Sequence, residues 1–157
     1  MRYSKGKWVA SNRDTWSVDS TLNKIIYAYI KKLYDGLSKS ECHGVPMVYV
    51  DRQAAIDGLE DGCEGDVSKA DALRFKDLEE LLWVFGTEEP DISDYDFHME
   101  IVRGEPNERG NTPITILTTG VNGEAEKERY HNDCVAYDKR KKKGYILFGE
   151  IYNTLDW

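Results

Sequence analysis

The stretch Asp14-Thr-Trp-Ser-Val-Asp-Ser-Thr-Leu22 starts the first long helix that this 157-residue sequence predicts. Serine, threonine and aspartate are favoured at helix N-termini because their side-chain oxygens accept hydrogen bonds from free backbone N–H groups. From Leu22 onward, apolar residues recur at helical spacing as far as Leu33, and Gly36 is a plausible stop. We therefore expect a helix from about Ser17 to Gly36.

Two more helices are predicted by the same kind of spacing. Leu78, Leu81, Leu82 and Phe85 form one apolar stripe, which predicts a helix over 68–85. A long third helix is expected from residue 124 onward, where aromatic residues recur at spacings of three and four. Two glycines inside this last helix, at positions 144 and 149, are expected to weaken or kink it.

Short runs of strand-forming residues complete the prediction. Strands are expected at 7–10, 97–102 and 113–119, with a hairpin loop between the last two. Residues 47–50 suggest a brief strand or extended segment, and the acidic, glycine-rich stretch 57–66 suggests a loop. Together these elements predict an α+β fold, with a three-helix core and a small antiparallel sheet in a single domain spanning 1–157.

Bulk composition narrows the setting of the protein. No apolar run approaches membrane-spanning length, and the N-terminal residues lack the apolar region of a signal peptide, so we expect a cytosolic protein. The three cysteines are odd in number and widely spaced, which indicates reduced thiols. The ten tyrosines and four tryptophans are residue types that often occupy interfaces and binding sites.

Charge is distributed unevenly along the chain, whose net value is −8. Residues 1–40 carry eight basic and three acidic side chains, whereas residues 41–108 carry five basic and nineteen acidic ones. The acidic middle third argues against general nucleic-acid binding, which needs a continuous basic surface. It is compatible with a basic partner protein, with a cation, or with a solvated acidic surface.

The start of the first helix is also the first candidate site. Helix N-termini bind anions through free N–H groups, and Arg13 and Lys24 would offset the repulsion between a phosphate and the carboxylates of Asp14 and Asp19. The alternative is a doubly capped helix in which Trp16 is a hydrophobic staple. Both interpretations stay open at the level of sequence.

No catalytic or metal-binding motif emerges elsewhere. His43 is a candidate general base or ligand donor, but no nucleophile motif surrounds it. His131 and Cys134 stand three residues apart on the last helix, yet two ligands do not complete a metal site, so no metal and no cofactor is predicted. The basic run 139–143 has the highest local density of positive charge and could attract an anion. Alternatively, it is an exposed basic face late in a helix, where positive charge suits the helix dipole.

Four segments resemble a family of small, uncharacterised accessory proteins of tailed bacteriophages. The matching segments are Asp14-Thr-Trp-Ser-Val-Asp-Ser-Thr-Leu22, His43-Gly-Val-Pro46, Leu81-Leu-Trp-Val-Phe85 and Leu147-Phe-Gly-Glu-Ile-Tyr-Asn-Thr-Leu-Asp-Trp157. Their order and spacing cover most of the chain. The chain departs from the family pattern where Glu150 and Ile151 replace a Lys-Tyr pair and where the terminal Trp and Asp are exchanged. The resemblance implies a phage origin and a host-cytoplasmic setting, without an established activity.

Three functions are compatible with these features. The leading hypothesis is a protein that counters host antiviral defence by sequestering a small nucleotide-derived signal, with Trp16, Trp83 or Tyr152 stacking on a base. The second is an acidic inhibitor of a host defence enzyme. The third is a small hydrolase that uses Asp14, Asp19 and His43; the chain is more readily interpreted as a binder than as an enzyme.

A homo-oligomer is also expected. The last helix presents more aromatic surface than a small core needs, and symmetric dimers are a common way to cover such a stripe. The residues concerned are Tyr130, Tyr137, Tyr145, Phe148, Tyr152 and Trp157.

Overall fold

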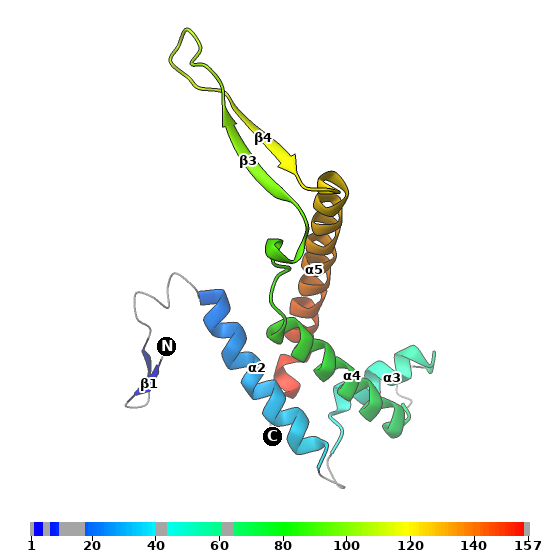
Figure 1. The fold of residues 1–157 in the computed structure, drawn as a ribbon. Helices are drawn as coiled ribbons and strands as arrows, with labels where there is room; N and C mark the ends of the chain where they lie inside the picture. The colour runs from blue at the N-terminus through cyan, green and yellow to red at the C-terminus, as the bar shows by residue number, and fades with distance from the viewer. Residues whose placement is uncertain (1, 5–6, 10–17, 40–43, 61–64, 156–157) are drawn as a thin grey trace. The chain divides into compact units, whose positions relative to one another are not determined.

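The computed structural model describes residues 2–4, 7–9, 18–39, 44–60 and 65–155, with side chains from Thr21 onward. Its helices are α2 (Val18–Leu37), α3 (Met47–Ile56), α4 (Val67–Gly86) and α5 (Gly123–Ile151), with short 3-10 turns η1 (Ile92–Asp94) and η2 (Tyr152–Thr154). Its strands are β1 (Arg2–Ser4), β2 (Lys7–Val9), β3 (His98–Arg103) and β4 (Ile114–Thr119). Figure 1 shows their order along the chain, and the expected α+β class is confirmed.

Contacts divide the chain into two compact units. The first comprises residues 1–87 and 142–157, and the second comprises residues 88–141. Helix α5 passes from the second unit into the first at residue 142.

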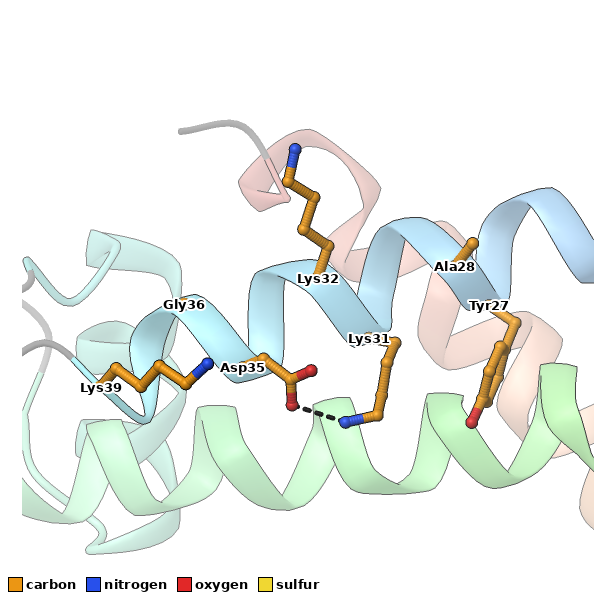
Figure 2. A pocket seen from close by; sticks show the side chains of 7 residues that line it. All are labelled: Tyr27, Ala28, Lys31, Lys32, Asp35, Gly36 and Lys39. Atoms are coloured by element: carbon orange, nitrogen blue, oxygen red, sulfur yellow. Dashed lines mark hydrogen bonds and ion pairs between the residues drawn. The ribbon is translucent and has the colours of Figure 1, made fainter.

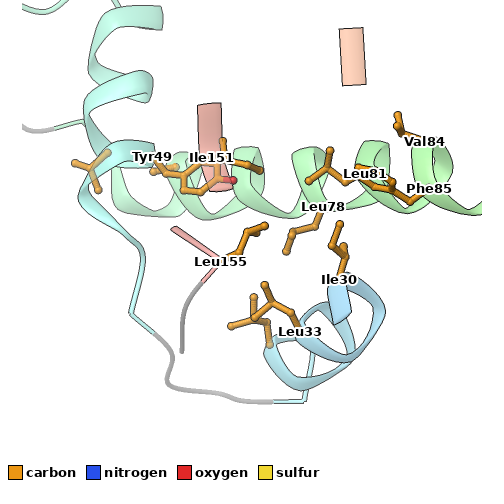
Figure 3. Packing of buried hydrophobic residues seen from close by; sticks show 12 residues of the cluster. Ile30, Leu33, Tyr49, Leu78, Leu81, Val84, Phe85, Ile151 and Leu155 are labelled. Atoms are coloured by element: carbon orange, nitrogen blue, oxygen red, sulfur yellow. The ribbon is translucent and has the colours of Figure 1, made fainter. Parts of the chain in front are cut away.

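The core of the first unit is built by the predicted apolar stripes. Ile30 and Leu33 of α2 are buried against Leu78 and Leu81 of α4, as Figure 3 shows, and Leu155 after η2 joins the same cluster. Helix α4 begins at an N-cap, because the Asp66 carboxylate accepts hydrogen bonds from two backbone N–H groups of the first turn. The predicted helices at 17–36 and 68–85 are thus confirmed within about a residue at each end.

Helix α3 replaces the extended segment expected at 47–50. The buried residues of this helix are Tyr49, Val50, Gln53 and Ala54, which is the i, i+1, i+4, i+5 spacing of one helix face. The first four residues are apolar or aromatic and resemble a strand when considered alone. The helical period appears only when the following turn is included. The prediction of an extended segment was wrong because four residues are too few to distinguish the two periods.

A buried polar contact joins α3 to α4. The Arg52 guanidinium Nη1 lies 2.5 Å from the Asp77 carboxylate, and Asp77 is almost fully buried. Arg74, also buried, donates from Nη1 to the carbonyl oxygen of Gly44 at 3.0 Å. The two buried charges, Asp77 and Arg74, each have a partner, which is the condition under which the interior tolerates them, whereas Arg52 is partly exposed.

The second unit contains a hairpin and the first part of α5. Strands β3 and β4 pair antiparallel, with Ile101 opposite Ile116, which confirms the two strands expected there. The chain leading into β3 is held on α5 by Tyr95, whose hydroxyl donates to Asp133 at 2.7 Å and whose ring meets Tyr130 at 5.1 Å. That hydrogen bond raises the pKa of Tyr95 to about 12.

Strands β1 and β2 form a second small antiparallel pair near the N-terminus. Strand β2 confirms the strand expected at 7–10, and β1 has no counterpart in the sequence-based prediction. In the part of the chain that the structure describes, no helix is both long and apolar enough to cross a membrane.

Candidate binding pocket

Five of the eight predicted ligand-binding residues cannot be located. Arg13, Asp14, Trp16 and His43 lie outside the described residues, and Asp19 lies in the first turn of α2 with its side chain outside the description. Neither the anion site at the helix start nor the hydrolase constellation is therefore placed by the structure.

The other three predicted residues lie in the first unit and differ in their exposure and in their position relative to the pocket. Tyr152 is 61% exposed and lines a pocket. Trp83 is half-buried and packs against the hydrophobic core from α4, so its ring serves the fold. Lys24 is exposed on α2 and is not part of the pocket lining.

The pocket lies between α2 and the chain that ends α5. Its volume is about 370 Å³, which is within the range of small-molecule sites. Its lining consists of Ile25, Ile26, Tyr29, Phe148, Tyr152, Asn153 and Leu155. Apolar and aromatic side chains dominate this list, and a single amide supplies the neutral polar group that fixes orientation in such sites.

Three contacts hold the aromatic walls in place. The Tyr29 hydroxyl donates to the carbonyl oxygen of Leu155 at 2.5 Å, which joins α2 to the residue after η2. On the opposite wall, the Phe148 ring meets Tyr152 at 5.6 Å and the buried Phe85 at 5.1 Å, both in edge-to-face arrangements. Phe148 thus connects the exposed Tyr152 ring to the core.

Chemically, the pocket suits binding more than proton transfer. Exposed aromatic faces stack on planar rings, and the Asn153 amide both donates and accepts hydrogen bonds, as the edge of a nucleobase requires. Its lining side chains include no histidine, cysteine, carboxylate or lysine.

Several lysines lie along α2 and just after its end. Lys31, Lys32 and Lys39 line an open hollow of about 640 Å³ together with Tyr27 and Asp35, as Figure 2 shows. Lys31 already forms an ion pair, because its ammonium group lies 2.6 Å from the Asp35 carboxylate. This hydrogen bond raises the pKa of Lys31. Lys32 points away from that pair and forms no ion pair with any residue that the structure describes.

Lys32 connects this basic face to the pocket. Ile25, Tyr29 and Lys32 follow the i, i+4, i+7 spacing of one helix stripe, so Lys32 lies one turn beyond Tyr29 on the same side of α2. Lys32 itself is not part of the pocket lining.

The basic run 139–143 does not form a single patch. Consecutive helix residues are about 100° apart, so five of them extend over more than a full turn. Lys141 is buried, with its ammonium 5.0 Å from the centre of the Tyr137 ring, whereas Lys139, Lys142 and Lys143 are exposed. The run therefore offers less concentrated charge than its sequence suggests.

Metal-binding groups do not cluster in the described chain. Within residues 18–39, 44–60 and 65–155, no three His, Cys, Asp or Glu side chains come close enough to hold a metal ion. Cys134 is a half-buried free thiol on α5, and His131 on the same helix is exposed.

Sequence reasoning missed most of the pocket for an identifiable reason. Ile25, Ile26 and Tyr29 belong to the apolar repeat that predicted α2, and their spacing alone does not distinguish a pocket wall from the core. The available signal was the width of that repeat, because Ile25 and Tyr29 lie beyond the face that Ile30 and Leu33 bury.

Comparison of the chain with models of protein families, with curated proteins and with solved structures finds no match.

Proposed function

We propose that this protein binds and sequesters a small nucleotide-derived signal, and that it does so as a phage accessory protein countering antiviral defence in the host cytoplasm. The observation that carries the binding proposal is the aromatic pocket of about 370 Å³ beside a lysine-rich helix face. A planar base would stack on Tyr152, and a phosphate would reach Lys32.

The pocket chemistry supports capture in preference to conversion. Sequestration needs affinity alone, and the lining offers stacking surface and one amide without an acid or base that works near neutral pH. The phage setting rests on the sequence resemblance, and it supplies the biological reason for a stoichiometric binder.

Binding should be measured by isothermal titration calorimetry with a panel of cyclic mononucleotides and cyclic dinucleotides. Stacking on an aromatic side chain contributes about 1–3 kcal/mol per base, so Tyr152→Ala should weaken binding by roughly 5- to 150-fold. Tyr145→Ala is the matched control, because Tyr145 is a half-exposed ring of α5 that packs on Phe85 outside the pocket.

The phosphate contact is tested separately. Lys32→Gln should weaken the binding of nucleotides and reduce the salt dependence of that binding. The affinity for the corresponding nucleosides, which lack the phosphate, should change little. Lys76→Gln removes an exposed lysine from α4, outside the pocket, and should change neither quantity. Absence of binding across the panel, or equal losses in the Tyr152 and Tyr145 variants, would refute the proposal.

A further inference from the structure

The candidate pocket is small for a nucleotide-derived ligand. Its volume of about 370 Å³ lies near the lower end of the range of about 300 to 1,000 Å³ that small-molecule sites occupy. A mononucleotide contains one base, one sugar and one phosphate, whereas a cyclic dinucleotide contains two of each and is correspondingly larger. The size of the pocket therefore bears on which of these two ligand classes it can enclose.

The aromatic walls of the pocket suit one stacked ring. Tyr29 on α2 is 41% exposed and Tyr152 in η2 is 61% exposed, and both line the pocket. The third ring, Phe148, is half-buried and makes edge-to-face contacts with Tyr152 and with the buried Phe85. A planar ring held between two walls uses both of them, and the described lining supplies no further aromatic side chain. These walls therefore provide for a single base.

A single side-chain amide supplies the hydrogen-bonding position beside the exposed ring. Asn153 directly follows Tyr152, lines the pocket with it, and offers a donor and an acceptor on one carboxamide. The Tyr29 hydroxyl, by contrast, already donates to the carbonyl oxygen of Leu155 at 2.5 Å. Each nucleobase presents its donors and acceptors in a fixed order along its edge, so one amide pairs with one base edge at a time.

The charges near the pocket suit a single phosphate. The lining contains no cation, so the phosphate of a bound nucleotide has to lie outside it. Lys32 follows Tyr29 by one turn of α2, whereas the neighbouring Lys31 is already paired with Asp35 at 2.6 Å. The two phosphates of a cyclic dinucleotide lie on opposite sides of its ring, so a lysine that contacts one of them would not reach the other.

We infer that the pocket holds one nucleobase, whose edge the Asn153 amide contacts, and that its ligand is a mononucleotide with a single phosphate group. This inference rests on the function proposed above and narrows its ligand class. A cyclic dinucleotide would insert one of its bases and leave the other in solvent. The second base makes no contact with the protein, so it adds no affinity.

Isothermal titration calorimetry with two ligands that share a base tests how many bases the protein holds. The ligands are a cyclic mononucleotide and the cyclic dinucleotide of the same base, compared at the same ionic strength for each of the common bases. Both should bind with one ligand per chain, and the dinucleotide should be tighter by no more than about threefold. A second stacked base would instead tighten its binding by about 5- to 150-fold.

A second measurement tests Asn153 as a specificity-determining residue. The wild type should prefer some bases over others, and Asn153→Ala should reduce the ratio between its best and poorest cyclic mononucleotide by about fivefold or more. Tyr152→Ala should instead weaken all of them. Asn132→Ala is the matched control, because Asn132 is an exposed asparagine of α5 outside the pocket lining, and it should leave the ratio unchanged.

The possible outcomes separate this inference from the proposed function. A cyclic dinucleotide that binds about fivefold or more tightly than the mononucleotide, or that is shared by two chains, would overturn the single-base inference and leave nucleotide capture in place. A wild type without base preference, or a preference that Asn153→Ala leaves unchanged, would overturn the role of Asn153. If neither ligand class binds, the proposed function is refuted and the inference fails with it. Far-UV circular dichroism confirms that each variant keeps its helices.

Discussion

Two glycines of α5 provide the sharpest test of how this helix packs, because the structure gives them opposite environments. A Cβ atom built on Gly144 would lie 2.0 Å from Cγ2 of Val84, and Val84 is completely buried in α4. A Cβ atom on Gly149 would meet nothing within 4 Å. The sequence predicts the same weakening of the helix at both positions, so their difference arises from tertiary packing.

The magnitudes follow from two opposing effects. Alanine stabilises a helix over glycine by about 0.5–1 kcal/mol, so Gly149→Ala should raise the free energy of unfolding by that amount. Gly144→Ala gains the same propensity, but forcing a methyl group into a packed core costs about 1–3 kcal/mol. With so close an approach we expect the upper part of that range, and a net loss of about 1–2 kcal/mol.

Urea unfolding followed by far-UV circular dichroism measures both changes under identical conditions. The two variants should differ in free energy of unfolding by about 1.5–3 kcal/mol, with the wild type between them. Val84→Ala makes room for the new methyl group, so combining it with Gly144→Ala should cost less than the two single changes added together. If Gly144→Ala matches Gly149→Ala in stability, α5 does not pack on Val84 and the reasoning fails.

Two further predictions concern the core of the first unit. Leu78→Ala should lower the free energy of unfolding by about 2–5 kcal/mol in the same urea assay, because Leu78 of α4 is completely buried in the core. A loss below about 1 kcal/mol would contradict that burial. The pKa of Tyr49 is raised from 10.0 to about 12, mainly by burial and then by the nearby Asp77 carboxylate. The folded state therefore favours the neutral phenol. The free energy of unfolding should fall by up to about 3 kcal/mol as the pH rises from about 10 towards 12. Tyr49→Phe should reduce this loss of stability at alkaline pH. It should cost little at neutral pH, because among the described residues the Tyr49 hydroxyl has no hydrogen-bond partner. If the variant loses stability with pH as steeply as the wild type, Tyr49 is not the group responsible.

The long elements were predictable because their information is local. The apolar repeat of α2 and the stripe through Leu78 and Phe85 repeat often enough to define a helical period. Helix α3 was missed because its first four residues satisfy a strand pattern as well. Its helical identity depends on Gln53 and Ala54, which are buried although neither is a strongly apolar marker.

The candidate site was predictable only in part because it depends on distant residues. Tyr152 was identified as a stacking residue from its type, and the structure places it in the pocket. Its partner Tyr29 lies more than a hundred positions away, and their proximity depends on the packing of the end of α5 against α2. No local pattern encodes which side of a helix stripe will remain open once the core has formed.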